Sequence, residues 1–258
     1  MEVSVDLGLQ GKKAIVCASS RGLGRGCAMA LAEAGCDLVL NGRDETILAK
    51  TAKEIRDKFG VHVIEIPGDV SDPERQAALL AACPGPDILV NNNGGPPRRA
   101  FAELDRAKIL EGVTQNMVTP LELVQAVIDG MAERGFGRIV NITSLSVYVP
   151  IPGLDLSSGA RAGLTSFLAG VARTVAHRNV TINNLLPGKL DTDRLRGAFS
   201  ADVSDEERKA KLSAEIPAKR LGTPEEFGQI CAFLCSVHAG YLTGQNIPVD
   251  GGLYVSAF

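Results

Sequence analysis

The sequence lacks the charge pattern of a nucleic-acid-binding or membrane-surface protein. Lys and Arg number 27 against 30 Asp and Glu, giving a formal net charge of -3, and both signs are interspersed along the chain. Binding to nucleic acid or to an anionic membrane is typical of a clustered excess of basic residues. We therefore expect neither partner, and any anion must be bound by a local site.

Long apolar runs and closely spaced cysteines are also missing. The sequence contains no stretch of about 18 uninterrupted apolar residues, the length of a membrane-spanning helix. The first residues, Met1 to Asp6, lack the basic and apolar regions of a secretory signal. Six cysteines in 258 residues are too sparse for a disulfide framework, and several have apolar neighbours. These absences predict a cytoplasmic protein with reduced thiols and no membrane segment.

One group of metal-binding residue types does occur near the end of the chain. Cys231, Cys235 and His238 are spaced so that a helix could bring them to one side as metal ligands. Phe233 and Leu234 indicate instead a helix that packs on the core, and no fourth ligand is apparent. We expect no metal.

Short apolar runs alternate with helical patterns along the whole chain. We expect strands at 13–18, 36–41, 61–67, 87–91, 137–142, 180–186 and 245–249, and helices at 22–34, 45–59, 73–82, 103–114, 120–134, 159–177 and 224–237. Strands that are continuously apolar and separated by helices are typical of a parallel sheet covered on both faces. The prediction is one α/β domain over residues 1–258, with a doubly wound, Rossmann-type sheet of about seven parallel strands. Its ligand crevice would lie at the carboxyl ends of the strands.

The segment 189–220 interrupts this alternation, because it is rich in charge and contains a single expected helix. Ser204 and Glu207 form the pattern of a capping box at the start of that helix. A long insertion at the carboxyl edge of a sheet is usually a lid over the substrate. The alternative is a solvated surface helix without a role.

Four short segments carry a family resemblance. They are the turn 17–24 between a strand and a helix, Asn91-Asn92-Asn93-Gly94, Ile142-Thr143-Ser144 and Pro187-Gly188. In this order and spacing they resemble the short-chain dehydrogenase/reductase family over nearly the whole length, most closely its 3-oxoacyl-carrier-protein reductase branch. The resemblance implies an oxidoreductase that uses a nicotinamide dinucleotide to reduce a small carbonyl compound or to oxidise an alcohol.

The turn 17–24 is the expected phosphate site. A tight strand-to-helix turn of small residues lets backbone amides and the helix dipole meet a pyrophosphate, and Gly22 and Gly24 allow close approach. The family has glycine where this chain has Ala18, and usually threonine at Cys17; Ala18 fits only if its φ is not positive. The alternative is a glycine-rich turn that serves packing alone. The resemblance assigns cofactor binding to Ala18, Ser20, Arg21, Gly22, Leu23, Gly24, Arg43, Asp69, Val70, Asn92, Asn93, Gly94, Arg161, Pro187 and Gly188.

In the family Asp69 holds the adenine, and segment 91–94 lines the adenosine side. The chain departs from the family at Asn93, where alanine is common. NAD-selective enzymes place an acidic residue after the second strand, where it binds the ribose hydroxyls. This chain has Asn41-Gly42-Arg43 there, and the guanidinium of Arg43, joined by that of Arg21, offers forked donors to a 2′-phosphate. The cofactor is therefore predicted to be NADP. Asp44 either faces the ribose or caps the next helix.

The family reduces a carbonyl with an asparagine, a serine, a tyrosine and a lysine, and this chain matches the first two. Asn116 would organise a helix and a bound water, and Ser144 would donate a hydrogen bond to the substrate oxygen. The alternatives are a buried amide that satisfies the backbone and a hydroxyl that merely ends a strand.

Ser157 and Arg161 stand where the family has its tyrosine and lysine. A serine hydroxyl is a weaker acid than a phenol and is too short to take its place. Arg161 keeps a positive charge and two donors for the nicotinamide ribose, but a guanidinium does not release its proton near neutral pH. Tyr148 is either a substitute acid or a residue that forms a wall of the substrate site or serves packing. Asp155 is either a proton donor or a helix cap.

Three functions remain open at this point: a reductase whose acid is a water relayed from Ser144 and Ser157, an enzyme of other chemistry, and an NADP-binding sensor or structural subunit without turnover. Arg98 and Arg99, after Pro96-Pro97, either meet an anionic substrate or lie in a solvated loop.

The family also forms dimers and tetramers through its two long central helices, here about 103–134 and 159–177. Small residues that would permit such packing are Ala160, Ala162, Gly163 and Ala169. A homo-oligomer, dimer or homotetramer, is therefore expected.

Overall fold

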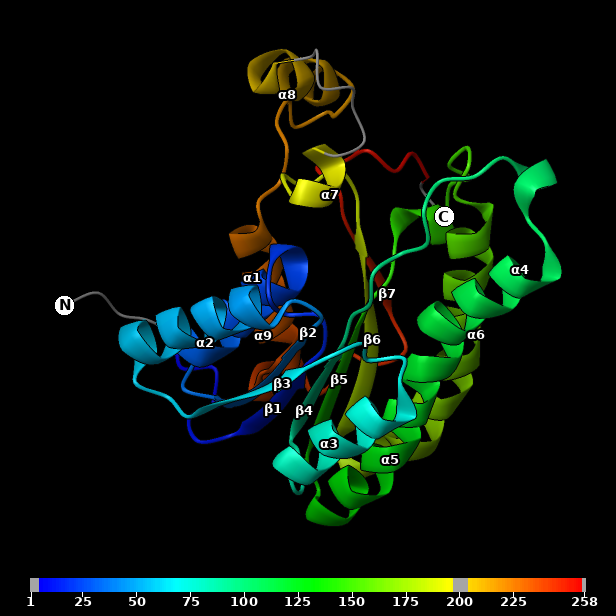
Figure 1. The fold of residues 1–258 in the computed structure, drawn as a ribbon. Helices are drawn as coiled ribbons and strands as arrows, with labels where there is room; N and C mark the ends of the chain where they lie inside the picture. The colour runs from blue at the N-terminus through cyan, green and yellow to red at the C-terminus, as the bar shows by residue number, and fades with distance from the viewer. Residues whose placement is uncertain (1–4, 197–203, 257–258) are drawn as a thin grey trace.

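The computed structural model describes residues 5–196 and 204–256 and contains one parallel sheet. Its seven described strands have the order β3-β2-β1-β4-β5-β6-β7 (Figure 1). They are β1 (Lys13–Val16), β2 (Asp37–Gly42), β3 (Val63–Pro67), β4 (Ile88–Asn91), β5 (Gly137–Ile142), β6 (Val180–Pro187) and β7 (Asn246–Val249). The predicted doubly wound fold is confirmed. Because the order reverses between β1 and β4, the crevice opens at the carboxyl ends of these strands.

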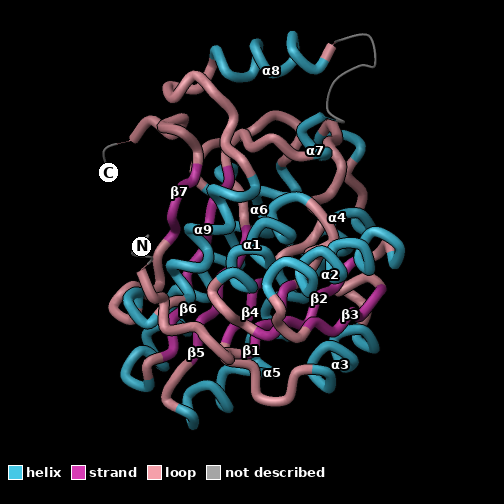
Figure 2. Tube along the Cα trace, turned by 90° about the vertical axis from the view of Figure 1, so that its left-hand side faces the viewer, coloured by secondary structure: helices cyan, strands magenta, loops and turns pink. Residues whose placement is uncertain are grey.

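Helices cover both faces of the sheet (Figures 1 and 2). One face carries α1 (Gly22–Glu33), α2 (Glu45–Phe59) and α9 (Pro224–Cys235). The other carries α3 (Pro73–Ala82), α5 (Thr119–Arg134) and α6 (Asp155–Val175), with α4 (Arg106–Val113) packed on α6. Adjacent strand residues face opposite cores: Val16 packs in the first and Ile15 in the second. This explains why the strands are continuously apolar.

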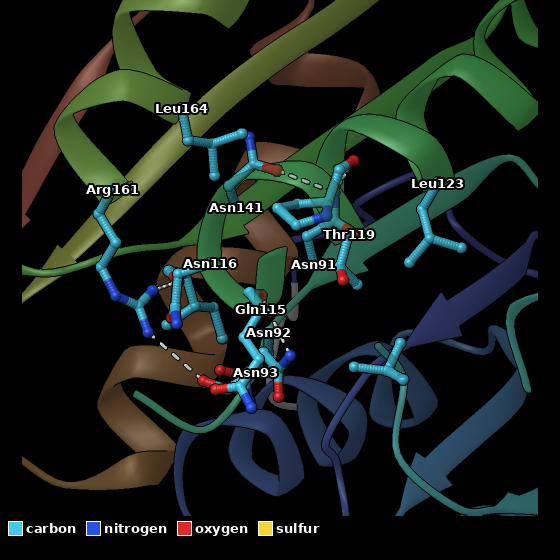
Figure 3. A pocket seen from close by; sticks show the side chains of 13 residues that line it. Asn91, Asn92, Asn93, Gln115, Asn116, Thr119, Leu123, Asn141, Arg161 and Leu164 are labelled. Atoms are coloured by element: carbon cyan, nitrogen blue, oxygen red, sulfur yellow. Dashed lines mark hydrogen bonds between the residues drawn. The ribbon is translucent and has the colours of Figure 1, made fainter. Parts of the chain in front are cut away.

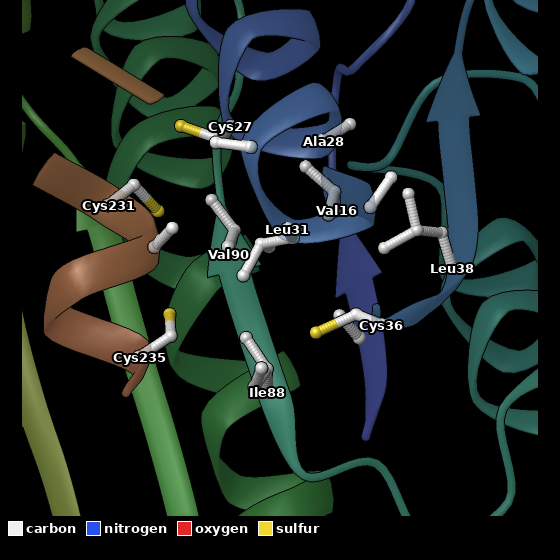
Figure 4. Packing of buried hydrophobic residues seen from close by; sticks show 14 of the residues in the cluster. Val16, Cys27, Ala28, Leu31, Cys36, Leu38, Ile88, Val90, Cys231 and Cys235 are labelled. Atoms are coloured by element: carbon white, nitrogen blue, oxygen red, sulfur yellow. The ribbon is translucent and has the colours of Figure 1, made fainter. Parts of the chain in front are cut away.

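The closest helix contact is the crossing of α1 and α9. A Cβ atom on Gly26 would lie 2.1 Å from the carbonyl oxygen of Pro224, and one on Gly228 would lie 2.1 Å from that of Gly26. Only glycine fits at either position. Next to this crossing Cys27, Cys231 and Cys235 lie in the apolar core, together with Cys36 (Figure 4).

The cysteines behave as buried apolar residues. All six are free and buried, and burial raises the pKa of the Cys36 thiol and raises that of Cys17 to about 12. His238 lies apart from the cysteines in the turn η5 (Val237–Ala239), where its Nε2 atom is 2.8 Å from the carbonyl oxygen of Asp6. The part of the chain that the structure describes contains no group of three or more side chains able to hold a metal.

The start of α6 and the separation of α4 from α5 differ from what the sequence predicted. Helix α6 begins at Asp155 instead of 159, because packing against α4 and α5 keeps Gly159 inside the helix despite its low helix propensity. Leu154 is its N-cap, so Asp155 is no cap; it lies in the first turn, where the helix dipole favours a carboxylate. The helices α4 and α5 are not separate, since the π-helical turn η2 (Thr114–Val118) joins them.

The insertion 189–220 contains α7 (Asp193–Arg196) in addition to the expected helix α8 (Asp205–Ala214). The predicted capping box is confirmed: the Glu207 amide donates to Ser204 Oγ at 3.2 Å, and the Ser204 amide to Glu207 Oε2 at 3.3 Å. The ends of the insertion are joined, because the Asp191 amide donates to the Gly222 carbonyl at 2.8 Å. Both helices lie beyond the carboxyl ends of the strands (Figure 1).

Within residues 5–196 and 204–256, no helix has both the length and the apolar character needed to cross a lipid bilayer.

Candidate active site

The turn before α1 presents free backbone amides at the edge of the crevice. Its N-cap residue, Arg21, makes no side-chain cap, and the first turn of α1 contains no acidic residue. By contrast, α2 and α9 are capped by Asp44 and Thr223 and have acidic first turns. A Cβ atom on Gly24 would lie 2.3 Å from the Ala18 carbonyl oxygen. The open amides and the missing side chain fit a pyrophosphate group.

Ala18 adopts the left-handed conformation, with a φ of 45°. The condition under which alanine would fit without strain is therefore not met, and the glycine of the family has a physical reason. Two asparagines hold the strained residue: the Ala18 amide donates to Asn41 Oδ1 at 3.3 Å, and Asn92 Nδ2 donates to the Ala18 carbonyl at 3.1 Å. A left-handed alanine costs about 1–2 kcal/mol relative to an ordinary conformation.

Arg43 is the charged group that remains available near the end of β2. Asn41 is buried, and its amide group donates to the carbonyls of Ile66 and Gly68, both at 3.0 Å. Asp44 accepts a hydrogen bond from the Ile47 amide at 3.0 Å and is therefore the helix cap. Arg43 is exposed and forms no ion pair with any carboxylate in the described chain.

The other expected cofactor residues lie around the same crevice. Asp69 accepts from the Ser71 amide at 2.9 Å, and Asn93 Nδ2 donates to Ser71 Oγ at 2.9 Å and to the Gln115 carbonyl at 3.1 Å. Asn93, which differs from the family, thus ties the end of β4 to neighbouring segments. The remaining residues lie at the end of a strand, in the segments that follow strands, or in the first turn of α1, and they are Ser20, Leu23, Val70, Gly94, Pro187 and Gly188.

Ser144 follows β5 directly and caps the short turn η3 (Leu145–Val147). Its Oγ atom accepts a hydrogen bond from the Ser146 amide at 3.1 Å. Since that oxygen is used as an acceptor, the hydroxyl hydrogen is left to donate to a substrate oxygen. The position and the polarity suit the predicted role.

Asn116 lies in the π-helical turn η2 and lines a small cavity (Figure 3). Its Nδ2 atom donates to the Gly112 carbonyl at 3.2 Å, whereas its Oδ1 atom has no partner. Asn91 Oδ1 and Thr119 Oγ1, from two other lining residues, are also buried without a described partner. The cavity has a volume of about 20 Å³, and a site of this size accommodates about one water molecule. A water molecule in this cavity would be a suitable hydrogen-bond donor to these three oxygens.

Arg161 lies on α6, one helical turn after Ser157. Its side chain connects the end of β5 with the segment that follows β4. Its Nε atom donates to Ser157 Oγ at 3.2 Å. Its Nη1 atom donates to the Ile142 carbonyl at 2.7 Å and its Nη2 atom to the Asn93 carbonyl at 3.4 Å (Figure 3). Burial, followed by the charge of Arg194, lowers the pKa of Arg161 to about 10, so the group remains a cation near neutral pH. Three of its five N–H groups are used by the protein, and one on each Nη atom remains for a ligand.

The two substitute acids considered above lie at the margin of this arrangement. The Tyr148 side chain is 40% exposed, stacks on Tyr254 with ring centroids 5.0 Å apart, and places its hydroxyl 3.5 Å from the Asn246 carbonyl oxygen. This arrangement favours the interpretation of Tyr148 as a wall residue. Asp155 is exposed at the start of α6.

A ladder of asparagine side chains crosses four strands beneath the site. Asn91 donates to Asn141 at 2.9 Å, Asn141 to Asn184 at 2.9 Å and Asn184 to Asn246 at 2.8 Å. These residues are register partners in β4, β5, β6 and β7. Sequence reasoning missed the ladder because strand order and register are needed to align the four residues.

Arg194 of α7 was also missed. Its Nη1 atom donates to the Gly95 carbonyl at 3.1 Å and its Nη2 atom to the Pro96 carbonyl at 3.3 Å, so α7 reaches across the crevice to the segment after β4. The only signal in the sequence was its place in the insertion.

Comparison with known proteins gives consistent matches over almost the entire chain. The family model described as Enoyl-(Acyl carrier protein) reductase matches residues 17–254. A 3-oxoacyl-[acyl-carrier-protein] reductase of Vibrio cholerae is 34% identical over 253 residues, which cover 96% of this chain and 100% of that protein. An acetoacetyl-CoA reductase of Allochromatium vinosum is 33% identical, covering 94% of this chain and 98% of the relative.

Solved structures of similar proteins have the same fold as this chain. The L-sorbose reductase of Gluconobacter frateurii, complexed with NADPH and L-sorbose, superposes with a TM-score of 0.91 at 29% identity, covering 98% of this chain and 100% of that one. A 3-oxoacyl (acyl-carrier-protein) reductase of Agrobacterium tumefaciens with NADP bound has a TM-score of 0.88 at 28% identity, with 98% of each chain covered.

Proposed function

Because the chain belongs to the short-chain dehydrogenase/reductase family, in a branch similar to the 3-oxoacyl-carrier-protein reductases, we propose that it is an NADP-dependent reductase of a small carbonyl compound. The observation that carries the proposal is the arrangement at the carboxyl ends of β4 and β5. There a hydroxyl donor, Ser144, and a buried cation, Arg161, lie on the same crevice as the open amides of the turn before α1. The solved neighbours bound to NADPH or NADP support the cofactor.

The residues of this chain provide orientation and charge. When bound, NADPH supplies a hydride to the carbonyl carbon. Ser144 donates a hydrogen bond to the carbonyl oxygen, and Arg161 contributes a positive charge that stabilises the negative charge developing there. Arg161 keeps its proton near neutral pH, so the proton for the product hydroxyl comes from water, relayed by the hydroxyl of Ser144 or Ser157.

The proposal is tested by following NADPH consumption with a panel of carbonyl compounds. The panel contains acetoacetyl-CoA, other 3-oxoacyl thioesters, and small oxo acids with their esters. The expected result is consumption of NADPH with at least one class, with one alcohol formed per NADPH by mass spectrometry. NADPH binding seen by calorimetry, without consumption by any member of the panel, would overturn the proposal.

That contrary result would support a second function, an NADP-binding sensor or structural subunit. The observation that favours it is specific to this chain: Ser157 and Arg161 are hydrogen-bonded to each other, and the phenol of Tyr148 is directed at the main chain of β7. No turnover is then required of the site.

The chain is further proposed to form a dimer or tetramer in which the insertion 189–220 acts as a lid. The helix α4 exposes Ile109 and Leu110, and α6 exposes Phe167, which supplies apolar surface for a partner copy. Light scattering at micromolar concentration should give the mass of two or four chains. A mass of one chain would contradict the assembly.

A further inference from the structure

Three arginines from separate parts of the chain meet at the segment that follows β4. Arg161 comes from α6 and binds the carbonyl of Asn93, while Arg194 comes from α7 and binds the carbonyls of Gly95 and Pro96. Arg98 lies in the segment itself, and its Nη1 atom donates to the Pro152 carbonyl at 3.3 Å. Two of the guanidinium groups thus bind carbonyls of the segment after β4, and the third binds the segment just before α6.

The described residues leave the charge of these arginines without a carboxylate partner. Within residues 5–196 and 204–256, none of the three forms an ion pair with a carboxylate. The nearby carboxylates have other partners, since Asp193 is 4.0 Å from Arg21 and Asp191 is 2.7 Å from Lys209. Burial and then the charge of Arg98 lower the pKa of Arg194, just as Arg194 lowers that of Arg161. An anion placed among them would relieve this repulsion.

The backbone is shaped to hold this group of arginines. A Cβ atom on Gly95 would lie 2.6 Å from Nη2 and 2.8 Å from Nη1 of Arg194, so the absence of a side chain at Gly95 makes room for the guanidinium. The Arg99 amide donates to the Gly153 carbonyl at 3.1 Å, which fixes the segment carrying Arg98 against the start of α6. These contacts favour a binding site over a solvated loop.

We propose that the substrate of the reductase carries a carboxylate in addition to its carbonyl group, and that Arg98 and Arg194 bind this carboxylate while Arg161 lies beneath it. The proposal rests on the proposed function and narrows its substrate to oxo acids. Arginine suits this role because its planar fork of donors matches the two oxygens of a carboxylate. The phosphates of the cofactor are the competing occupant, since α7 also approaches Arg21.

The experiment compares matched pairs of substrates that differ only in charge: acetoacetate with methyl acetoacetate, and 2-oxobutanoate with its methyl ester. The ratio of kcat/KM for acid over ester is measured with NADPH for the unmodified protein, Arg98→Gln and Arg194→Gln. Arg106→Gln is the control, because Arg106 is exposed on α4 and takes part in none of the hydrogen bonds of the three arginines. We expect a ratio of at least about ten, lowered about tenfold by either site substitution and unchanged by the control, as for the loss of one charge-assisted pair.

Other outcomes separate this inference from the proposed function. Activity on esters without a preference for the acids would overturn the inference and leave the reductase standing. If no compound is reduced, calorimetric titration of the protein–NADPH complex with butanoate and methyl butanoate decides. Binding of butanoate alone, lost in Arg194→Gln, would keep the carboxylate site, and its absence would overturn it. A tenfold weaker binding of NADPH by Arg194→Gln would assign this arginine to the cofactor instead.

Discussion

The cofactor half of the molecule, β1 to β3, and the catalytic half, β4 to β6, have departed from the family in different ways. In the first half the turn before α1 keeps its shape although Ala18 is strained, because two asparagines hold its amide and carbonyl. In the second half the scaffold is intact, and Ser157 and Arg161, which are hydrogen-bonded to each other, stand where the resemblance to the family implies a tyrosine and a lysine. A pyrophosphate is bound largely by backbone amides, which many sequences supply. Proton transfer depends on one side chain, and can therefore be lost without change of fold.

The substitution with the largest expected effect is at Ser144, the proposed hydrogen-bond donor of the catalytic half. Ser144→Ala removes the donor to the carbonyl oxygen and should lower kcat by about 10²- to 10³-fold, the usual effect of losing such a donor. Steady-state kinetics on the best substrate of the panel measures it. The dissociation constant of NADPH should stay within about twofold, since the cofactor half is untouched. Ser166→Ala, an exposed position on α6, is the control. An unchanged kcat would remove Ser144 from the mechanism.

The second prediction restores the family pair in the catalytic half. Ser157→Tyr combined with Arg161→Lys should raise turnover of 3-oxoacyl substrates by about 10²-fold, because a phenol beside an ammonium is a better acid near neutral pH. Arg161→Lys alone should not do so. Since Ser157 is buried, thermal unfolding must show that the ring is accommodated.

A different result would identify another acid. High activity in the unmodified protein that is abolished by Tyr148→Phe, but unaffected by Ser157→Ala, would assign the proton donor to Tyr148. The catalytic half would then have kept an acid, and its contrast with the cofactor half would no longer hold.

The third prediction concerns the cofactor half. NADPH should bind at least about tenfold more tightly than NADH, or about 1.4 kcal/mol, and Arg43→Ala should remove most of this difference. The reason is the exposed guanidinium at the end of β2, where an acidic residue is absent. Calorimetric titration with both cofactors measures the difference. Equal affinities in the unmodified protein, or a preference for NADH, would contradict NADP selection, and an unchanged preference in Arg43→Ala would place the phosphate elsewhere.

The smallest effect concerns the strain at Ala18. Ala18→Gly should raise the free energy of unfolding by about 0.5–1 kcal/mol, because relief of the left-handed strain exceeds the entropy cost of glycine. Thermal unfolding should shift upward by about 1–4 °C for a chain of this size. Ala49→Gly, in the middle of α2, is the matched control and should destabilise by about 1 kcal/mol. A lower stability for Ala18→Gly would show that the turn is not strained.

The amino-acid sequence by itself determined the class of fold and the order of its elements, which follow from periodicity and from local spacing. The resemblance to the family, and not periodicity, pointed to a phosphate turn at Gly22 and Gly24 and to Asn116, Ser144, Ser157 and Arg161 as site positions. The sequence also identified the Asn41-Gly42-Arg43 signature, although not that Asn41 is fully occupied by backbone carbonyls.

Only the tertiary structure decided the positive φ of Ala18, the hydrogen bonds of Arg161 to the Ile142 and Asn93 carbonyls, the asparagine ladder and the contact of Arg194 with the segment after β4. The start of α6 at Asp155 belongs with them, because packing on α4 and α5 outweighs the low helix propensity of Gly159. Each depends on which strands are neighbours, in what register, and which distant segments meet across the crevice. Such contacts join residues from about 20 to 100 positions apart, and no local pattern specifies them.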